Sequence, residues 1–229
     1  MLRGLLGKNS QPRGCFLHMP KCGGTSLREA LSALLGERLL TDYAGLKGGS
    51  DKEKYEGLMG YVGRPLLIRK GQCVYGHFRA VKYVNPLDRR CDDIVLVTIL
   101  REPLERLVSN YRYLVALGDD SVAGYRALRE HGFDFEWFAR QNWQRNVYAR
   151  QMFQVPVNRF DYVGTYESLE RSWESIALKL APDLLDVPEL PRLNQTDKLA
   201  CSPPPRPKVS VSLRSAIQDF NSLDYAIYE

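Results

Sequence analysis

The 229-residue chain is 44% hydrophobic and 26% charged, which is the composition of a globular domain and excludes an extended disordered chain. Its net charge of +5 suits an anionic ligand but is too small to indicate a dedicated nucleic-acid-binding protein. The five cysteines have no regular spacing, which argues against both a disulfide framework and a zinc site. The length suits a single domain that spans residues 1–229.

The elements predicted from the sequence alternate between strands and helices. Apolar or β-branched runs predict strands at residues 14–19, 72–75, 93–100 and 160–164. Apolar residues at helical spacing predict helices at residues 26–35, 104–117, 121–131, 134–152, 168–180 and 212–228. Residues 43–70 are mixed, with a loop at 48–50, and the proline-rich residues 186–208 predict a loop or lid. This alternation predicts an α/β fold with a central parallel sheet and helices on both faces.

Membrane and secretion signals are weak in this sequence. No window approaches the ~18 consecutive apolar residues that span a bilayer. Residues 1–14 contain too short an apolar stretch for a secretory signal. If the chain is full length, we therefore expect a cytoplasmic protein without stable membrane insertion; a trimmed Golgi lumenal domain is the alternative.

The first chemical motif follows the first predicted strand and reads H-M-P-K-C-G-G-T-S, from His18 to Ser26. Its two glycines let the backbone wrap closely around an anion, and the next helix offers free N–H groups at its positive end. Lys21 adds a mobile positive charge, and Thr25 and Ser26 add hydroxyl donors. The lysine precedes the glycines, whereas in a Walker A loop it follows them. The motif therefore predicts a phosphate-binding loop unlike that of ATPases, against the alternative of a plain turn.

The second motif, R-E-P-L-E-R-L-V-S-N-Y, begins at Arg101, directly after the clearest predicted strand. Open α/β sheets bind ligands at the carboxyl ends of their strands, which is where we expect Arg101. Ser109 lies about two helical turns further on, so an arginine fork and a serine hydroxyl could bind one phosphate together. In the structural alternative, Arg101 pairs with Glu105 and Ser109 packs within the helix.

Together, P-K-x-G-G-T-S and R-x-P-x-x-R-x-x-S-x-Y resemble the paired signature of sulfotransferases that use PAPS (3'-phosphoadenosine 5'-phosphosulfate). The resemblance is closest to the carbohydrate branch with the heparan and uronyl 2-O-sulfotransferases. Looser matches follow in the family's order at residues 75–78, 146–151, 163–167 and 193–196. The resemblance implies a P-loop-type three-layer α/β sandwich. It also implies sulfuryl transfer from PAPS to a hydroxyl of a carbohydrate acceptor, with PAP (3'-phosphoadenosine 5'-phosphate) as product and no required metal.

The resemblance also assigns roles to particular residues. Lys21 would contact the bridging oxygen of PAPS and act in catalysis, while Arg101 and Ser109 would bind the 3'-phosphate. Cys22 stands where the branch usually has threonine or serine, so one hydroxyl donor is lost. The expected cofactor-binding set is Lys21, Cys22, Gly23, Gly24, Thr25, Ser26, Arg101, Ser109 and Tyr166.

The acceptor hydroxyl needs a base that titrates near neutrality or lies within hydrogen-bond reach. His77 follows a predicted strand and a glycine, which places it at the carboxyl edge of the sheet, and it matches the family's Gly-His element. His77 is therefore the candidate base, against the alternative of a strand-end histidine bonded to the backbone. A carboxylate base at Glu29 or Glu102 is a further alternative. His18 is expected to have a positional role.

Two other classes of function fit the sequence. An ATP- and magnesium-dependent P-loop phosphotransferase fits the fold, although its lysine should follow the glycines. A non-catalytic nucleotide- or glycan-binding protein could retain the same loop without the chemistry. The expected partner is a hydroxylated acceptor, a saccharide by the resemblance, and not a nucleic acid. Six basic residues around His77 either bind an acidic sugar or form a solvated surface: Arg69, Lys70, Arg79, Lys82, Arg89 and Arg90.

Overall fold

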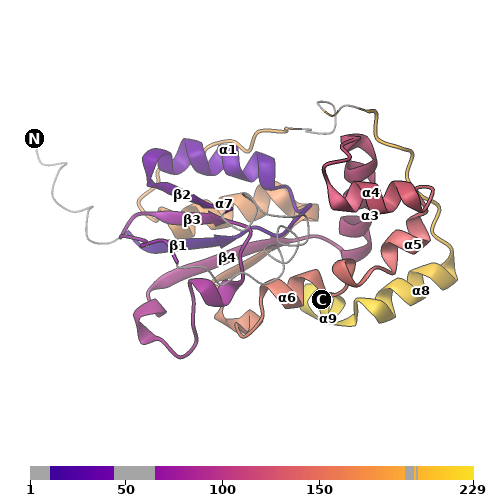
Figure 1. The fold of residues 1–229 in the computed structure, drawn as a ribbon. Coiled ribbons are helices and arrows are strands. Elements are labelled where there is room, and N and C mark those ends of the chain that lie inside the picture. Colours follow the sequence, from indigo (N-terminus) through magenta and orange to yellow (C-terminus); the bar gives the residue numbers. More distant parts are fainter. Residues whose placement is uncertain (1–10, 44–64, 194–198, 200) are drawn as a thin grey trace, which may run out of the picture.

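The computed structural model describes residues 11–43, 65–193, 199 and 201–229. Within these ranges the chain forms a five-stranded parallel sheet with the order β2-β3-β1-β4-β5, flanked by helices (Figure 1). This confirms the α/β fold with a central parallel sheet. The strands are β1 Arg13–Leu17, β2 Leu39–Asp42, β3 Cys73–Gly76, β4 Ile94–Leu100 and β5 Tyr162–Thr165. The loop predicted at 48–50 and the match at 194–196 lie outside the described residues.

The helices form a layer on each side of the sheet and a lobe beyond the carboxyl ends of the strands (Figure 1). Helix α1 lies above the sheet and contacts α7, while α6 and α9 lie below it. Helices α3, α4, α5 and α8 form the lobe around a second hydrophobic cluster. The helices are α1 Gly24–Leu35, α3 Pro103–Leu117, α4 Ala123–Glu130, α5 Phe135–Ala139, α6 Val147–Gln151, α7 Leu169–Leu180, α8 Val211–Phe220 and α9 Ser222–Tyr228.

Two predicted long helices are each broken in the structure, and an asparagine stands directly before the second helix of each pair. The helix predicted at 134–152 is divided into α5, which ends at Ala139, and α6, which begins after Asn146 with its left-handed φ of +49°. The helix predicted at 212–228 is divided at Asn221, whose side-chain amide donates to the Ile217 carbonyl at 3.0 Å. Its other side-chain atom, Oδ1, accepts a hydrogen bond from the Asn146 N–H at 3.0 Å. Asparagine side chains compete in this way with regular helix hydrogen bonds.

Strand β2 was not predicted; it has only four residues and follows shortly after the first helix. Asp42 at its end is buried and accepts hydrogen bonds from Lys82 Nζ and Tyr83 Oη, both at 2.6 Å. A buried charge is tolerated when it is paired and hydrogen-bonded in this way. Lys82 therefore anchors the edge of the sheet, and the interpretation of this residue as part of a sugar-binding surface is wrong.

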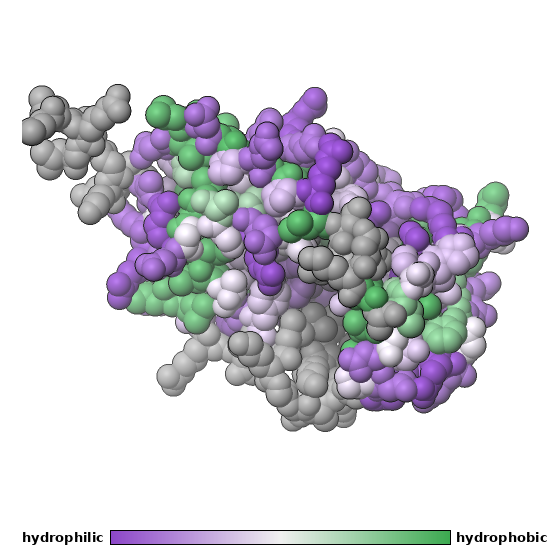
Figure 2. Space-filling model, turned by 90° about the horizontal axis from the view of Figure 1, so that it is seen from above, coloured by the Kyte–Doolittle hydropathy of each residue, from purple (hydrophilic) through white to green (hydrophobic). Residues whose placement is uncertain are grey.

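The main core lies between the sheet and its helix layers. Strand β4 is almost entirely buried, as expected for a continuous apolar run inside a parallel sheet. On the α1 side the surface is mostly hydrophilic, with apolar residues gathered in smaller areas (Figure 2), which is typical of helices facing water. None of the helices in the described ranges has the length and apolar character needed to cross a bilayer.

Candidate functional site

The carboxyl ends of the three central strands lie at one edge of the sheet. In the parallel register, Leu17 at the end of β1 is opposite Gly76 of β3 and Thr98 of β4. The chain leaves β1 toward β2 and leaves β4 toward β5, so the connections diverge in opposite directions between these neighbouring strands. Such a switch point leaves a crevice where α/β proteins bind ligands. A cleft of about 1060 Å³ lies at this edge.

Most of the site residues predicted from the sequence line this one cleft. They come from the loop after β1, the start of α1, the ends of β3 and β4, α3 and the segment after β5. The residues brought together are Lys21, Gly23, Gly24, Thr25, Ser26, His77, Arg101, Ser109 and Tyr166.

Cys22 is the predicted site residue that does not line the cleft. Its side chain is buried, and Sγ lies 3.7 Å from Tyr148 Oη and 3.6 Å from the Pro20 carbonyl oxygen. Burial raises the pKa of the thiol to about 12, so it stays protonated at neutral pH. The side chain at this position thus faces the core, and any contact of Cys22 with a ligand would come from its backbone.

The loop after β1 forms a tight turn at the start of α1. Gly23 caps the helix with φ +81°, and Lys21 also has a positive φ of +67°. The first turn of α1 contains no acidic residue. Backbone N–H groups of a first helical turn have no partner within the helix, and the helix dipole favours an anion there. The geometry therefore supports the predicted phosphate-binding loop.

We expect Gly24→Ala to destabilise the protein by about 1–3 kcal/mol because the added methyl group would overlap the His18 ring. That ring cannot easily move, since it is stacked between Tyr75 and His77 with centroid distances of 5.0 and 4.2 Å. Chemical denaturation measures the free energy of unfolding. Gly124→Ala in α4 is the control with little expected change, because its methyl group would lie 3.3–3.4 Å from movable side-chain atoms. Equal stability of the two variants would contradict this packing.

Lys21 and Arg101 bring two positive charges to the same end of the cleft. The Lys21 ammonium lies 3.7 Å from the centre of the Tyr113 ring, a cation–π contact. Burial, followed by the charge of Arg101, lowers the pKa of Lys21 to about 8. A bound anion would relieve this repulsion and favour the charged form of the lysine.

The Arg101 side chain is held in the cleft but incompletely hydrogen-bonded. Its guanidinium lies 4.3 Å from the centre of the Tyr166 ring, and Nη1 makes a long contact of 3.5 Å to the Lys21 carbonyl. Its buried Nε has no hydrogen-bond partner within the described part of the chain. Glu105, the partner considered from the sequence, forms its ion pair with Arg206 instead. The Arg101 fork is therefore available for an anionic ligand.

His77 is held through one nitrogen of its ring. Its Nδ1 lies 2.7 Å from the His18 carbonyl oxygen. Because a carbonyl oxygen only accepts, Nδ1 carries the proton and Nε2 keeps its lone pair. Burial lowers the pKa of His77, so the ring is neutral at neutral pH. The backbone bond considered as an alternative to catalysis thus exists and fixes the tautomer that a base needs.

The two carboxylates considered as alternative bases are outside the cleft lining. Glu29 is exposed on α1 and lies 3.5 Å from Arg28. Glu102 caps the start of α3, where it accepts a hydrogen bond from the Glu105 N–H at 2.7 Å, and it also accepts one from Tyr225 Oη at 2.8 Å. This geometry favours His77 over both carboxylates.

The basic residues that flank His77 in the sequence do not form one surface around it. Arg69 and Lys70 precede β3 and so lie at the opposite edge of the sheet from His77. Arg90 pairs with Asp88 at 2.8 Å on the exposed surface. For Arg69, Lys70 and Arg90, these positions favour the interpretation as a solvated surface.

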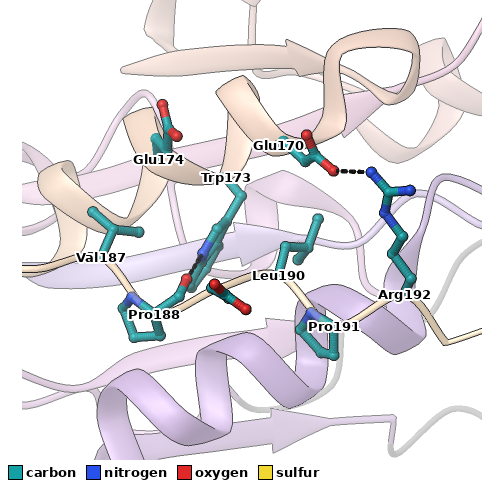
Figure 3. Close-up of a pocket in the computed structure, with 9 residues that line it drawn as sticks. Glu170, Trp173, Glu174, Val187, Pro188, Leu190, Pro191 and Arg192 are labelled. Carbon is teal, nitrogen blue, oxygen red and sulfur yellow. Dashed lines mark hydrogen bonds and ion pairs between the residues drawn. The ribbon is translucent and has the colours of Figure 1, made fainter.

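The strap, residues 187–193, contributes cleft residues that were not among the predicted site residues. Its last residue, Leu193, donates its N–H to Ser26 Oγ at 3.2 Å. Arg192 forms an ion pair with Glu170 at 2.7 Å, on the wall shared with a second cavity of about 610 Å³ (Figure 3). Trp173 Nε1 donates to the Pro188 carbonyl at 2.6 Å and fixes the start of the strap. The proline content indicated a loop or lid here, but no local pattern indicates these contacts.

Comparison of the sequence with protein-family models and with curated proteins returns no match. The assignment of a function therefore depends on the residues of the cleft and on their geometry.

Proposed function

We propose that this protein transfers a sulfuryl group from PAPS to a hydroxyl of a saccharide acceptor. One observation carries the proposal: a single cleft is lined by a phosphate-binding loop with its lysine, by a histidine whose Nε2 keeps its lone pair, and by an arginine and a serine from a distant segment. The residues concerned are Lys21, Gly23, Gly24, Thr25, Ser26, His77, Arg101 and Ser109.

The charges of the cleft fit a ligand with two anionic groups. The 5'-phosphosulfate would lie on the first turn of α1, where the backbone N–H groups and Lys21 meet it. The 3'-phosphate would accept hydrogen bonds from Arg101 and Ser109. Arg101 lines the cleft, and the terminal nitrogens of its guanidinium would donate to the phosphate oxygens.

The chemistry follows from these positions. His77 Nε2 takes the proton of the acceptor hydroxyl, and the oxygen attacks sulfur as the bond from sulfur to the bridging oxygen breaks. PAP leaves with the electron pair of that bond. Lys21 neutralises the charge that develops on the bridging oxygen, a role that a fixed ammonium can fill. His77 ends as an imidazolium and returns its proton to solvent.

The saccharide acceptor and a cytoplasmic location stay predictions. Arg171, an exposed residue of α7, lines the same cleft, and its charge suits an anionic acceptor such as an acidic polysaccharide. The tautomer of His77, with the lone pair on Nε2, favours a catalytic protein over one that only binds a nucleotide or a glycan.

We expect Arg101→Ala to weaken PAP binding by about 10- to 100-fold, the usual value of hydrogen bonds to a charged group. Binding of AMP, which lacks the 3'-phosphate, should change little. Titration calorimetry with both nucleotides measures the difference. Arg112→Ala is the matched control, because this arginine of α3 donates to the Pro204 carbonyl at 2.8 Å and is not part of the cleft lining. If Arg101→Ala weakened the binding of PAP and of AMP equally, the proposal that Arg101 binds the 3'-phosphate would be wrong.

A further inference from the structure

The backbone of Arg101 lies just beyond the end of β4. There its N–H and carbonyl groups form hydrogen bonds with a tyrosine side chain. Tyr148 of α6 is completely buried. Its hydroxyl donates to the Arg101 carbonyl at 2.6 Å and accepts from the Arg101 N–H at 3.2 Å. Cys22 Sγ of the phosphate-binding loop lies 3.7 Å from the same oxygen. One hydroxyl thus contacts both segments that form the nucleotide site.

We propose that the Tyr148 hydroxyl is a positioning group that fixes Arg101 for the 3'-phosphate; this rests on the proposed function. A phenol has one donor and a small number of acceptor sites, and Arg101 alone occupies one of each. With both of its backbone polar groups held by one atom, Arg101 has a fixed backbone from which its side chain enters the cleft. Cys22 brings the neighbouring loop to the same oxygen.

Tyr148 is itself held by the C-terminal helix. Asp224 of α9, which has no exposed surface, accepts hydrogen bonds from the backbone N–H groups of Tyr148 and Ala149 at 2.9 and 3.1 Å. The Arg106 guanidinium lies 5.8 Å from the centre of the Tyr148 ring. Such support from a second layer of residues is what keeps a binding group in a precise place. Tyr148 is therefore part of a rigid unit that reaches the site from below the sheet.

Tyr148→Phe tests this role because it removes a single oxygen atom and keeps the ring. We expect PAP affinity to fall by about tenfold, the effect of losing one net hydrogen bond at the site, while AMP affinity stays within about twofold of wild type. In an Arg101→Ala background the same substitution should cause no further loss of PAP affinity, because residues that act as one unit are not additive. Calorimetry of the four proteins with PAP and AMP, at a temperature where each is folded, gives these values.

Tyr111→Phe is the matched control for a lost buried hydroxyl. Tyr111 Oη donates to the Phe133 carbonyl at 2.8 Å in the second hydrophobic cluster, so its removal should affect stability but not PAP affinity. Should Tyr148→Phe fail to fold, Asp224→Ala removes the anchor of α6 and should give the same PAP-specific loss. Equal losses for PAP and AMP, or additive effects with Arg101→Ala, would overturn the positioning role.

The proposed function and this inference fail in different ways. If the wild-type protein does not prefer PAP over AMP, or if Arg101→Ala keeps that preference, the proposed function is wrong. If those two results are as expected and Tyr148→Phe binds PAP like the wild type, only the role of Tyr148 is wrong.

Discussion

Lys21→Ala is expected to lower the rate of sulfuryl transfer by about 10²- to 10³-fold, the usual loss when one group that stabilises developing charge is removed. The lysine lies in the cleft beside Arg101, at the loop where the leaving phosphate would gain charge. Transfer of radiolabelled sulfate from PAPS to a panel of acidic polysaccharides measures the rate. Lys179→Ala, an exposed lysine on α7, is the control and should retain full activity. A Lys21→Ala protein as active as the control would contradict the catalytic role.

The pH dependence gives a second readout for Lys21. Its pKa of about 8 in the free protein means that the positive charge is lost as pH rises through 8, so kcat/KM should fall on the alkaline side of that value. Lys21→Arg should move this limb to higher pH. The unfolded chain keeps the ordinary lysine pKa of 10.5 and binds more protons between pH 8 and 10.5. Lys21 therefore makes the stability of the free protein rise with pH in that window.

His77→Asn is expected to lower the rate by about 10²- to 10⁴-fold while leaving PAP affinity nearly unchanged, because a general base acts on the acceptor rather than on the nucleotide. The asparagine amide can still donate to the His18 carbonyl, so the variant removes the base with little change to the loop. The same transfer assay, with PAP calorimetry beside it, separates the two effects. His131→Asn is the matched control, because the Nδ1 of His131 also bonds to a backbone carbonyl, that of Ala127 at 2.8 Å.

The fall of kcat/KM at acid pH should be caused by protonation of His77. Its lowered pKa places protonation below the ordinary value of 6.5, so kcat/KM should fall as pH drops through that lower value. The residual activity of His77→Asn should lack this limb. For the same reason the unfolded chain binds more protons below pH 6.5, and His77 makes the protein less stable as pH falls. If the His77→Asn protein were as active as the wild type, another group would have to be the base.

The sequence was sufficient for the central part of the fold and for much of the candidate site. The buried run of β4 and the glycine loop before α1 have local patterns, and both elements formed as expected. In a parallel sheet the residues after successive strands meet at one edge, so His77 and Arg101 could be placed together from their positions after strands. Strand β2 was missed because four residues carry no clear alternation.

The contacts that organise the site could not be predicted because they depend on tertiary packing. Tyr148 is 47 positions from Arg101 and 126 from Cys22, and no local period indicates which side chain will reach a loop at that separation. The orientation of Cys22 depends on the turn that begins at Lys21. The φ of Lys21 is +67°, which is uncommon outside glycine. The left-handed turn at Asn146 is likewise accompanied by a hydrogen bond to Asn221, 75 positions away.

Titration calorimetry of the wild-type protein with PAP in the presence of a chelator, beside ADP and ATP with magnesium, tests directly whether the protein is a PAPS-dependent sulfotransferase. We expect PAP to bind without metal and at least about tenfold more tightly than ADP or ATP with magnesium, because Arg101 and Ser109 would bind the 3'-phosphate. Equal or tighter binding of ATP with magnesium would contradict a PAPS-dependent sulfotransferase and favour a phosphotransferase in its place.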